Sequence, residues 1–219
     1  MMSIQGFIKK QVFELKLWEI NEYFSKFSVY VADLKKQLQV KIGNSKNSLQ
    51  NEANENLQEQ IDSDLTSYYE EYDLTESVVE RNFYYSVIIQ LYTHVELAFN
   101  DLCKYNESVS NKKIKLSDFS GKGVERAKNY LVKVYDFVFQ ASDSEFLNEF
   151  NLIRNIIAHY NGNLKEITND KQLSKIEAIL NKNNEFSRNK DDYIILSQKY
   201  INSCLSKIRE IFKKIYSNI

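Results

Sequence analysis

The amino-acid sequence predicts an all-α protein, and three observations support this prediction. Proline is absent from the 219 residues and glycine occurs only five times, so the usual turn residues of hairpins, barrels and sandwiches are scarce. Hydrophobic residues make up 43% of the chain, which is enough to fill a core and excludes global disorder. Apolar residues also recur at helical spacing through most of the chain. We expect a four-helix bundle core preceded by a long helical hairpin.

Residues 1–75 are expected to form an N-terminal antiparallel helical hairpin. Apolar residues alternate at steps of four and three, the period of one helix face, and predict a helix over residues 7–41. Gly43-Asn44-Ser45 then offers C-cap and turn chemistry, and a second helical pattern follows over residues 49–68. A short connection between two long helices implies an antiparallel pair.

The second arm of this hairpin is strongly acidic. Between Asn47 and Glu80 there are ten acidic residues and no lysine or arginine. Such a run is either a solvated helix face or a docking surface for a basic partner, and both interpretations stay open.

Residues 76–219 are expected to form the helical bundle itself. Thr75 and Glu76 are typical of a helix start, and the helix predicted over residues 76–105 is apolar on more than one side. Further helices are predicted over residues 124–140, 144–160, 171–181 and 198–219, with Asn161-Gly162 ending the second of these and Ser197 capping the last. The apolar run Tyr193-Ile194-Ile195-Leu196 is the only hint of a strand.

A basic segment separates the first two helices of the bundle. Residues 106–122 lack apolar periodicity, which predicts a mobile loop, and they carry Lys112, Lys113, Lys115 and Lys122. The wider segment 104–133 holds eight basic and three acidic residues, a local charge of +5. This charge suits RNA phosphates, and it is equally consistent with a solvated loop or one paired with the acidic hairpin.

Composition also excludes several classes of protein. The formal net charge of −1 is unlike that of a polybasic nucleic-acid binder, so an anionic ligand must be held locally. Two cysteines 101 positions apart and two histidines are too few for a zinc site of the usual spacing, and we expect no metal and no cofactor. Neither a signal peptide nor a membrane-spanning apolar run is apparent, so we expect a cytoplasmic protein with reduced thiols.

One motif carries residues suited to chemistry, the stretch from Asn151 to Gly162 at a predicted helix end. Arginine and histidine are both rare in this chain, and Arg154 and His159 meet here. On a helical projection Arg154 borders a polar face that includes Asn155 and His159. The purely structural alternative is that Arg154 pairs with a carboxylate while His159 interacts with the last carbonyl groups of the helix.

The same helix has a second, narrower apolar stripe beyond its polar face, formed by Leu152 and Ile156. A helix with only one side to bury does not need this stripe, so we expect something to pack there. A second copy of the chain related by a two-fold axis is the partner that this pattern predicts.

This constellation resembles the Arg-x4–6-His motif of the HEPN superfamily (higher eukaryotes and prokaryotes nucleotide-binding domains). Arg154 and His159 match the catalytic pair, and Asn155 matches the polar residue that often follows the arginine. The resemblance covers residues 76–219 and implies an all-α homodimer. It further implies a metal-independent endoribonuclease, often a toxin held by an antitoxin or an effector of phage defence with a partner protein. Some members carry a modified tyrosine two residues after the histidine, whereas here Tyr160 directly follows it.

The chemistry of RNA cleavage fits these residue types. Attack by the 2′-hydroxyl needs a base, an acid for the departing 5′-oxygen and a cation for the phosphate charge. Histidine can perform either proton transfer near neutral pH, and a guanidinium matches phosphate geometry. Each chain offers one such histidine, so two proton transfers suggest two chains sharing a cleft.

Two further residues are weighed against structural roles. Glu96 lies on a polar track of the predicted helix 76–105 and either orients Arg154 or faces solvent. His94 aligns with apolar positions and is interpreted as an interior histidine rather than a second base. The alternatives to a nuclease are a non-catalytic HEPN-like module that binds nucleotides, RNA or protein, and a purely structural helical adaptor.

Overall fold

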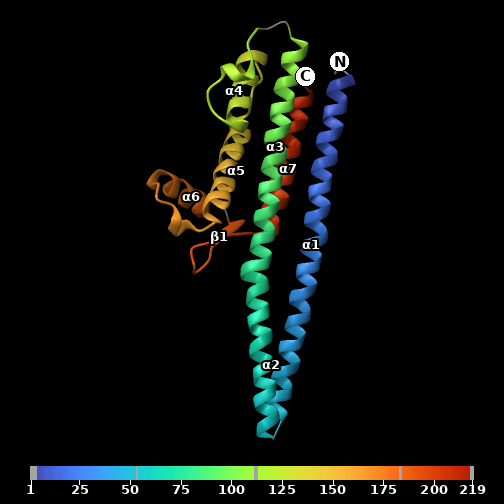
Figure 1. Ribbon diagram of the computed structural model, residues 1–219, viewed down its shortest axis with the longest axis vertical. Helices are drawn as coiled ribbons and strands as arrows, with labels where there is room; N and C mark the ends of the chain where they lie inside the picture. The colour runs from blue at the N-terminus through green and yellow to red at the C-terminus, as the bar shows by residue number, and fades with distance from the viewer. Residues whose placement is uncertain (1–3, 53, 111–112, 183, 218–219) are drawn as a thin grey trace. The chain divides into compact units, whose positions relative to one another are not determined.

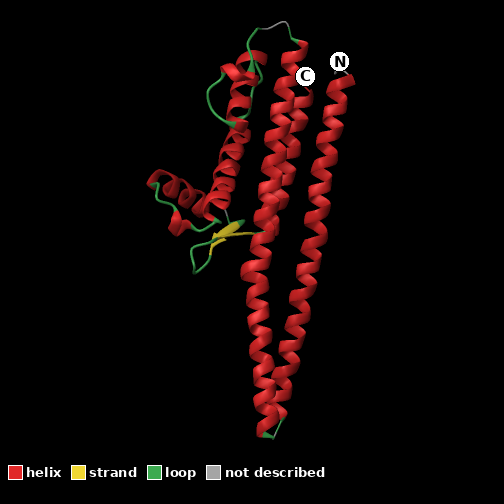
Figure 2. Cartoon of the chain, viewed as in Figure 1, coloured by secondary structure: helices red, strands yellow, loops and turns green. Residues whose placement is uncertain are grey.

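The computed structural model describes residues 4–52, 54–110, 113–182 and 184–217. It is 83% helical, and its described residues contain one sheet of two short strands (Figure 2). The elements, labelled in Figure 1, are α1 (Ile4–Asn51), α2 (Glu55–Leu74), the π-helical turn η1 (Thr75–Glu80), α3 (Arg81–Val109), η2 (Leu116–Asp118), α4 (Gly123–Tyr135), α5 (Ala141–Tyr160), η3 (Leu164–Glu166), α6 (Asp170–Lys182), β1 (Phe186–Arg188), β2 (Ile194–Leu196) and α7 (Gln198–Ser217). The all-α prediction is confirmed.

The predicted helical hairpin is present within residues 22–84, which form one compact unit. Gln39 Nε2 of α1 donates a hydrogen bond to the Tyr72 hydroxyl at 3.1 Å, and Lys35 Nζ bonds the Glu76 carboxylate at 2.8 Å. Earlier positions of α1 therefore meet later positions of the following segment, as antiparallel helices require.

The predicted turn at Gly43-Asn44-Ser45 is wrong, because α1 continues without a break to Asn51. Next to the glycine, Ile42 is buried, and the Lys41 ammonium lies 5.2 Å from the centre of the Tyr68 ring. Packing of this kind outweighs the cost of a glycine inside a helix, about 0.5–1 kcal/mol relative to alanine.

The predicted helix start at Thr75 is also wrong, because the helical chain runs through η1 into α3. Thr75 is buried and its hydroxyl donates to the Glu71 carbonyl oxygen at 2.8 Å, the bond that threonine forms inside a helix rather than at its N-cap. The sequence suggested a domain boundary at residue 75. In the structure, the contacts between residues group 22–84 in one compact unit. The other unit joins the residues up to 21 with those from 85 onward.

The core of this larger unit is rich in aromatic rings. Phe13 of α1 stacks on Phe212 of α7 with ring centres 4.1 Å apart, and Phe212 meets Phe99 of α3 at 5.0 Å. Tyr92 of α3 contacts Phe150 of α5 at 5.4 Å. The first turns of α1, which the sequence analysis placed outside the bundle, therefore belong to the core formed with α3, α5 and α7.

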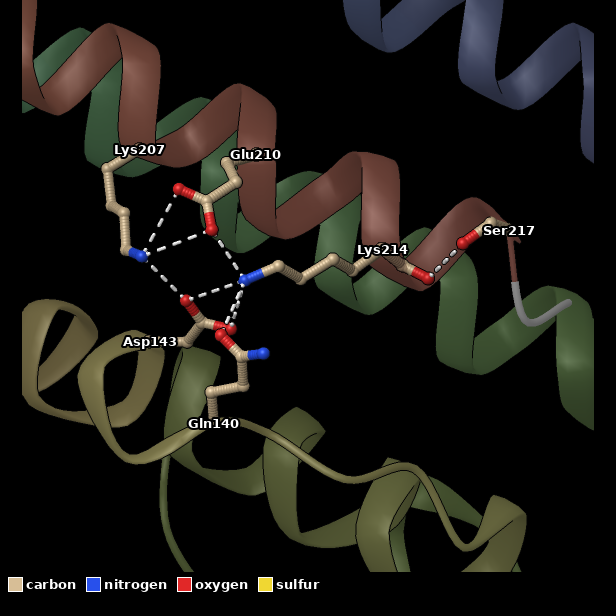
Figure 3. A network of polar contacts seen from close by, with 6 residues as sticks. All are labelled: Gln140, Asp143, Lys207, Glu210, Lys214 and Ser217. Atoms are coloured by element: carbon tan, nitrogen blue, oxygen red, sulfur yellow. Dashed lines mark hydrogen bonds and ion pairs between the residues drawn. The ribbon is translucent and has the colours of Figure 1, made fainter.

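A buried carboxylate joins α5 to α7 (Figure 3). The Asp143 side chain is 3% exposed and receives Lys207 Nζ at 2.8 Å and Lys214 Nζ at 3.1 Å. Lys214 Nζ also donates to the Gln140 side-chain oxygen Oε1 at 3.0 Å and pairs with the Glu210 carboxylate at 2.6 Å. The sequence pattern does not reveal this network, because its members on α5 and α7 are about 70 positions apart.

The end of α5 follows the prediction. Asn161 adopts the left-handed conformation as C-cap, and Gly162 follows with φ +75°. A Cβ atom at Gly162 would lie 2.0 Å from the Tyr85 hydroxyl oxygen, so no other residue fits without rearrangement.

The beginning of α7 also follows the prediction, since the Ser197 hydroxyl accepts the Tyr200 amide at 3.1 Å, which is an N-cap bond. The predicted strand is present as β2, and it pairs in antiparallel register with β1, which the sequence analysis missed. Among the described helices, none combines the length and apolar character needed to span a lipid bilayer.

Candidate functional site

Helix α5 presents the motif residues because of its amphipathic pattern. Phe150, Ile153 and Ile157 are buried on its core side. Arg154 and Asn155, on other sides of the helix, are only partly exposed. The sequence thus holds the motif at the surface by burying Ile156 and Ile157 between Arg154 and His159.

The Arg154 guanidinium is held by three neighbours. Its Nη1 atom donates to Asn155 Oδ1 at 2.8 Å, and its Nη2 atom donates to Glu96 Oε2 at 3.4 Å. The guanidinium carbon also lies 4.2 Å from the centre of the Tyr92 ring, within the range of a cation–π contact. Asn155 is itself tied to Asn151, whose side-chain oxygen accepts a bond at 3.3 Å. The arginine side chain remains 26% exposed, so it is not closed off from solvent.

Glu96 projects from α3 toward the start of α4 as well as toward Arg154. A Cβ atom at Gly123, the first residue of α4, would lie 2.7 Å from Glu96 Oε1. The sequence left open whether Glu96 orients Arg154 or faces solvent. In the structure the Glu96 carboxylate contacts Arg154. The side chain is also 34% exposed, so it is not withdrawn from solvent.

Burial and charge act in opposite directions on Tyr92. Burial raises the pKa of the Tyr92 phenol, and the adjacent Arg154 cation lowers it in part. The sequence analysis did not assign this tyrosine a role, although its place four residues before Glu96 on the same helix was a usable signal.

His159 lies at the opposite end of the motif, in the last turn of α5. It is exposed, and its ring meets the Tyr160 ring edge-on with centres 6.5 Å apart. Within the part of the chain that the structure describes, no hydrogen bond or ion pair links His159 to Arg154 or to another residue. Arg154 and His159 are five positions apart, which corresponds to about 7.5 Å along a helix axis. A single chain therefore gathers Arg154, Asn155 and Glu96 and leaves His159 and Tyr160 apart.

The candidate RNA-binding lysines differ in their relation to this cluster. Lys122 is the N-cap residue of α4, directly before Gly123, and is exposed. Lys113 and Lys115 are exposed in the preceding loop, where the Lys115 amide donates to Asp118 Oδ2 at 2.8 Å. Lys112 lies outside the described residues. Of these lysines, Lys122 is the one next in sequence to Gly123, at the start of α4.

The second apolar stripe of α5 is not an exposed surface. Ile156 is fully buried by the chain itself and only Leu152 is partly exposed. Beyond Gly162 the chain turns back, and η3 and α6 pack against α5. The chain itself therefore buries Ile156, and the sequence pattern did not reveal the return of the chain after α5, whereas Leu152 stays partly exposed.

His94 is partly buried against α1. Its ring stacks on Phe13 with centres 4.7 Å apart, and its Nε2 atom lies 3.1 Å from the Phe13 carbonyl oxygen. Burial lowers the pKa of His94, and the bond to Phe13 opposes this in part. The contacts of His94 with Phe13 are those of a structural histidine.

The two cysteines, Cys103 and Cys204, are free and buried. Among the residues with described positions, no group of three or more His, Cys, Asp or Glu side chains is arranged to hold a metal ion. The Arg154 cluster contains a guanidinium, two amides, a carboxylate and a phenol ring.

No protein-family model matches the chain, and no curated protein and no solved structure shows significant similarity to it. The resemblance to the HEPN superfamily therefore depends on the motif and on its place at the end of a core helix.

Proposed function

We propose that this chain is a HEPN-type endoribonuclease in which Arg154 and His159 act on the RNA backbone. The observation that carries the proposal is the Arg154 guanidinium, which Glu96 and Asn155 hold in place while part of it stays accessible. An exposed histidine on the same helix end supplies a group for proton transfer.

In this mechanism Arg154 binds the scissile phosphate and stabilises the charge that develops on its oxygens. One His159 removes the proton of the 2′-hydroxyl, and the new bond from that oxygen to phosphorus displaces the 5′-oxygen. A second His159 protonates the departing 5′-oxygen, so the products are a 2′,3′-cyclic phosphate and a 5′-hydroxyl. The two histidines come from two copies of the chain, which is the reason to propose a homodimer.

The test is RNA cleavage by the purified chain, measured beside RNA affinity. His159→Ala removes the proton-transfer group, so the rate is expected to fall by about 10²–10⁴ while RNA binding is retained. Arg154→Ala is expected to lower rate and affinity together, and Arg154→Lys to rescue poorly because an ammonium lacks paired planar donors. Asn155→Ala is expected to have a smaller effect.

The matched control is Arg209→Ala, since Arg209 is a half-exposed arginine of α7 whose ion pair to Glu14 lies outside the motif. Thermal melts show whether each variant folds. If folded His159→Ala and Arg154→Ala proteins cleave at the wild-type rate, Arg154 and His159 have only structural roles and the nuclease proposal must be abandoned.

Two further properties belong to the proposal. Cleavage is expected to persist in EDTA and to leave cyclic phosphate ends, because the mechanism assigns no step to a metal ion. Light scattering at micromolar concentration is expected to give a dimer, and a cleaving monomer would contradict the shared site. Growth arrest on induction of the wild type, absent with His159→Ala, would favour a toxin or phage-defence effector controlled by a partner protein.

The second candidate function is a non-catalytic interaction module that binds a basic partner. The observation in its favour is α2, whose seven acidic residues are all exposed. Within the described part of the chain, none of the seven forms an ion pair. Wild-type protein that binds RNA or a basic protein without cleaving RNA would support this alternative.

A further inference from the structure

Gly123 stands where a residue with a side chain would collide with the Glu96 carboxylate. A Cβ atom there would lie 2.7 Å from Glu96 Oε1 and 3.1 Å from Glu96 Cδ. The other carboxylate oxygen, Oε2, accepts the bond from Arg154. One carboxylate therefore lies against the first residue of α4 and the motif arginine at the same time.

The electrostatics of α4 reinforce this arrangement. The 13-residue helix begins at Gly123, and its N-cap residue Lys122 makes no side-chain capping bond. The N-terminus of a helix carries a partial positive charge, so a carboxylate beside it is stabilised. Glu96 is thus attracted both by the start of α4 and by the Arg154 guanidinium.

We propose that Gly123 and Glu96 together are positioning residues for Arg154. Gly123 leaves the space in which the Glu96 carboxylate is held, and Glu96 fixes the direction of the guanidinium. The catalytic consequence rests on the proposed function, whereas the positioning itself does not.

The ion pair between Glu96 and Arg154 orients the guanidinium more than it stabilises the fold, because both side chains are partly exposed. An ion pair whose side chains are 26% and 34% exposed contributes little to the free energy of unfolding. The direction of a guanidinium matters much more, because its paired donors must meet the phosphate oxygens, and a displacement of about 1 Å can cost about 10²-fold in rate.

A double-mutant cycle tests the proposal through cleavage of RNA. Gly123→Ala and Glu96→Ala are each expected to lower kcat/KM by about ten-fold or more. In the double variant the methyl group at position 123 no longer meets a carboxylate, so its rate is expected to equal that of Glu96→Ala alone. Glu96→Gln, which keeps an acceptor oxygen, is expected to retain more activity than Glu96→Ala. If the fold losses of the two single variants multiply in the double variant, the two residues act independently and the proposal is overturned.

The chain offers a matched control for backbone strain. Gly121 also has positive φ, +96° against +52° for Gly123, but a Cβ atom at Gly121 would approach Glu125 at 3.4 Å rather than Glu96. Gly121→Ala is therefore expected to strain the same loop and leave the cleavage rate near that of the wild type. An equal loss of rate in both alanine variants would show that loop strain, and not Glu96, is responsible.

A measurement that does not depend on nuclease activity distinguishes the positioning role of Gly123 and Glu96 from the proposed nuclease function. The guanidinium NMR signals of Arg154 are expected to shift and sharpen toward those of a freely rotating side chain in Gly123→Ala and in Glu96→Ala, while those of Arg209 stay unchanged. Unchanged Arg154 signals in both folded variants would refute the positioning role. A wild type that cleaves no RNA, with the shift observed, would refute the proposed function and leave the positioning intact.

Discussion

The Arg154 guanidinium carbon lies 4.2 Å from the centre of the Tyr92 ring, which itself packs against Phe150 at 5.4 Å. The Tyr92 residue is only 4% exposed, so its ring is held in the core beside the cation. Glu96 and Asn155 accept hydrogen bonds from the same guanidinium and set its direction.

Two replacements of Tyr92 distinguish the contribution of its aromatic ring from that of its hydroxyl group. Tyr92→Phe keeps the ring under Arg154 and is expected to cleave RNA at close to the wild-type rate. Tyr92→Leu removes a cation–π contact of about 1 kcal/mol, so a rate roughly five-fold lower is expected. Cleavage assays on both variants, with melts to measure the accompanying loss of packing, make the comparison. Equal rates for the two would mean that Tyr92 serves the core alone.

The Asp143 network predicts a specific loss of stability. Asp143→Asn leaves Lys207 and Lys214 without their shared carboxylate. Breaking a fully buried pair costs about 3–5 kcal/mol, and because both lysines are partly exposed we expect about 2 kcal/mol here. Denaturant unfolding measures the difference, and Asp191→Asn, an exposed aspartate outside the network, is the control expected to change little.

The same carboxylate predicts how stability depends on acid. Burial would raise the pKa of Asp143, but the hydrogen bonds from Lys207 and Lys214 outweigh it and leave that pKa below its usual range. The contribution of Asp143 is therefore complete above the unfolded-state pKa, near 3.9, and is lost as the pH falls below that value through the folded-state pKa. The difference in unfolding free energy between wild type and Asp143→Asn should shrink below about pH 4. A constant difference down to pH 2 would contradict this account.

His94 predicts a second pH effect, in a different range. Burial lowers the pKa of His94 in the folded protein, so the folded state binds this proton less well than the unfolded state. Stability contributed by the neutral imidazole is complete above the unfolded-state pKa, near 6.5, and declines as the pH falls below it. Unfolding free energies at pH 7.5 and 5.5 should therefore differ less in His94→Gln than in the wild type. An equal dependence on pH in His94→Gln and in the wild type would contradict this account.

The helices of the fold could be predicted because each repeats a buried face along its length. The start of α7 shows this well, since Ser197 supplies the expected N-cap and the residues after it alternate toward the core. Local stop signals were less reliable. Gly43 and Thr75 were interpreted as a turn and a cap, yet both lie inside helices, because packing against the opposite arm or a bond within the helix decides their state.

In the candidate site, too, some residues could be predicted from the sequence and others could not. Arg154, Asn155 and His159 could be found from the sequence, because their chemistry and spacing lie within one helix. Glu96 could be suggested from its polar track, but the approach of Gly123 could not, since it depends on how α4 meets α3. The burial of Ile156 was hidden for the same reason, because it depends on the return of the chain after α5.

Replacement of Gly43 tests whether this residue lies in a turn, as the local sequence suggests, or inside α1, as in the structure. In the structure Gly43 lies in the interior of α1, and a Cβ atom there would meet nothing within 4 Å. Alanine is favoured over glycine inside a helix by about 1 kcal/mol, through the smaller conformational entropy of its unfolded chain. Gly43→Ala is therefore expected to raise the free energy of unfolding by about that amount, and the melting temperature by about 2–4 °C.

Gly162→Ala is the matched comparison, because that glycine has a φ of +75° and its Cβ atom would lie 2.0 Å from the Tyr85 hydroxyl oxygen. The same chemical change should there destabilise the protein by more than about 1 kcal/mol, since strain and overlap are added. Opposite signs for the two substitutions, measured by denaturant unfolding followed by circular dichroism, support a continuous α1. Destabilisation by Gly43→Ala would instead mean that residues 43–45 form the turn that their sequence suggests, because only a turn needs the conformational freedom of that glycine.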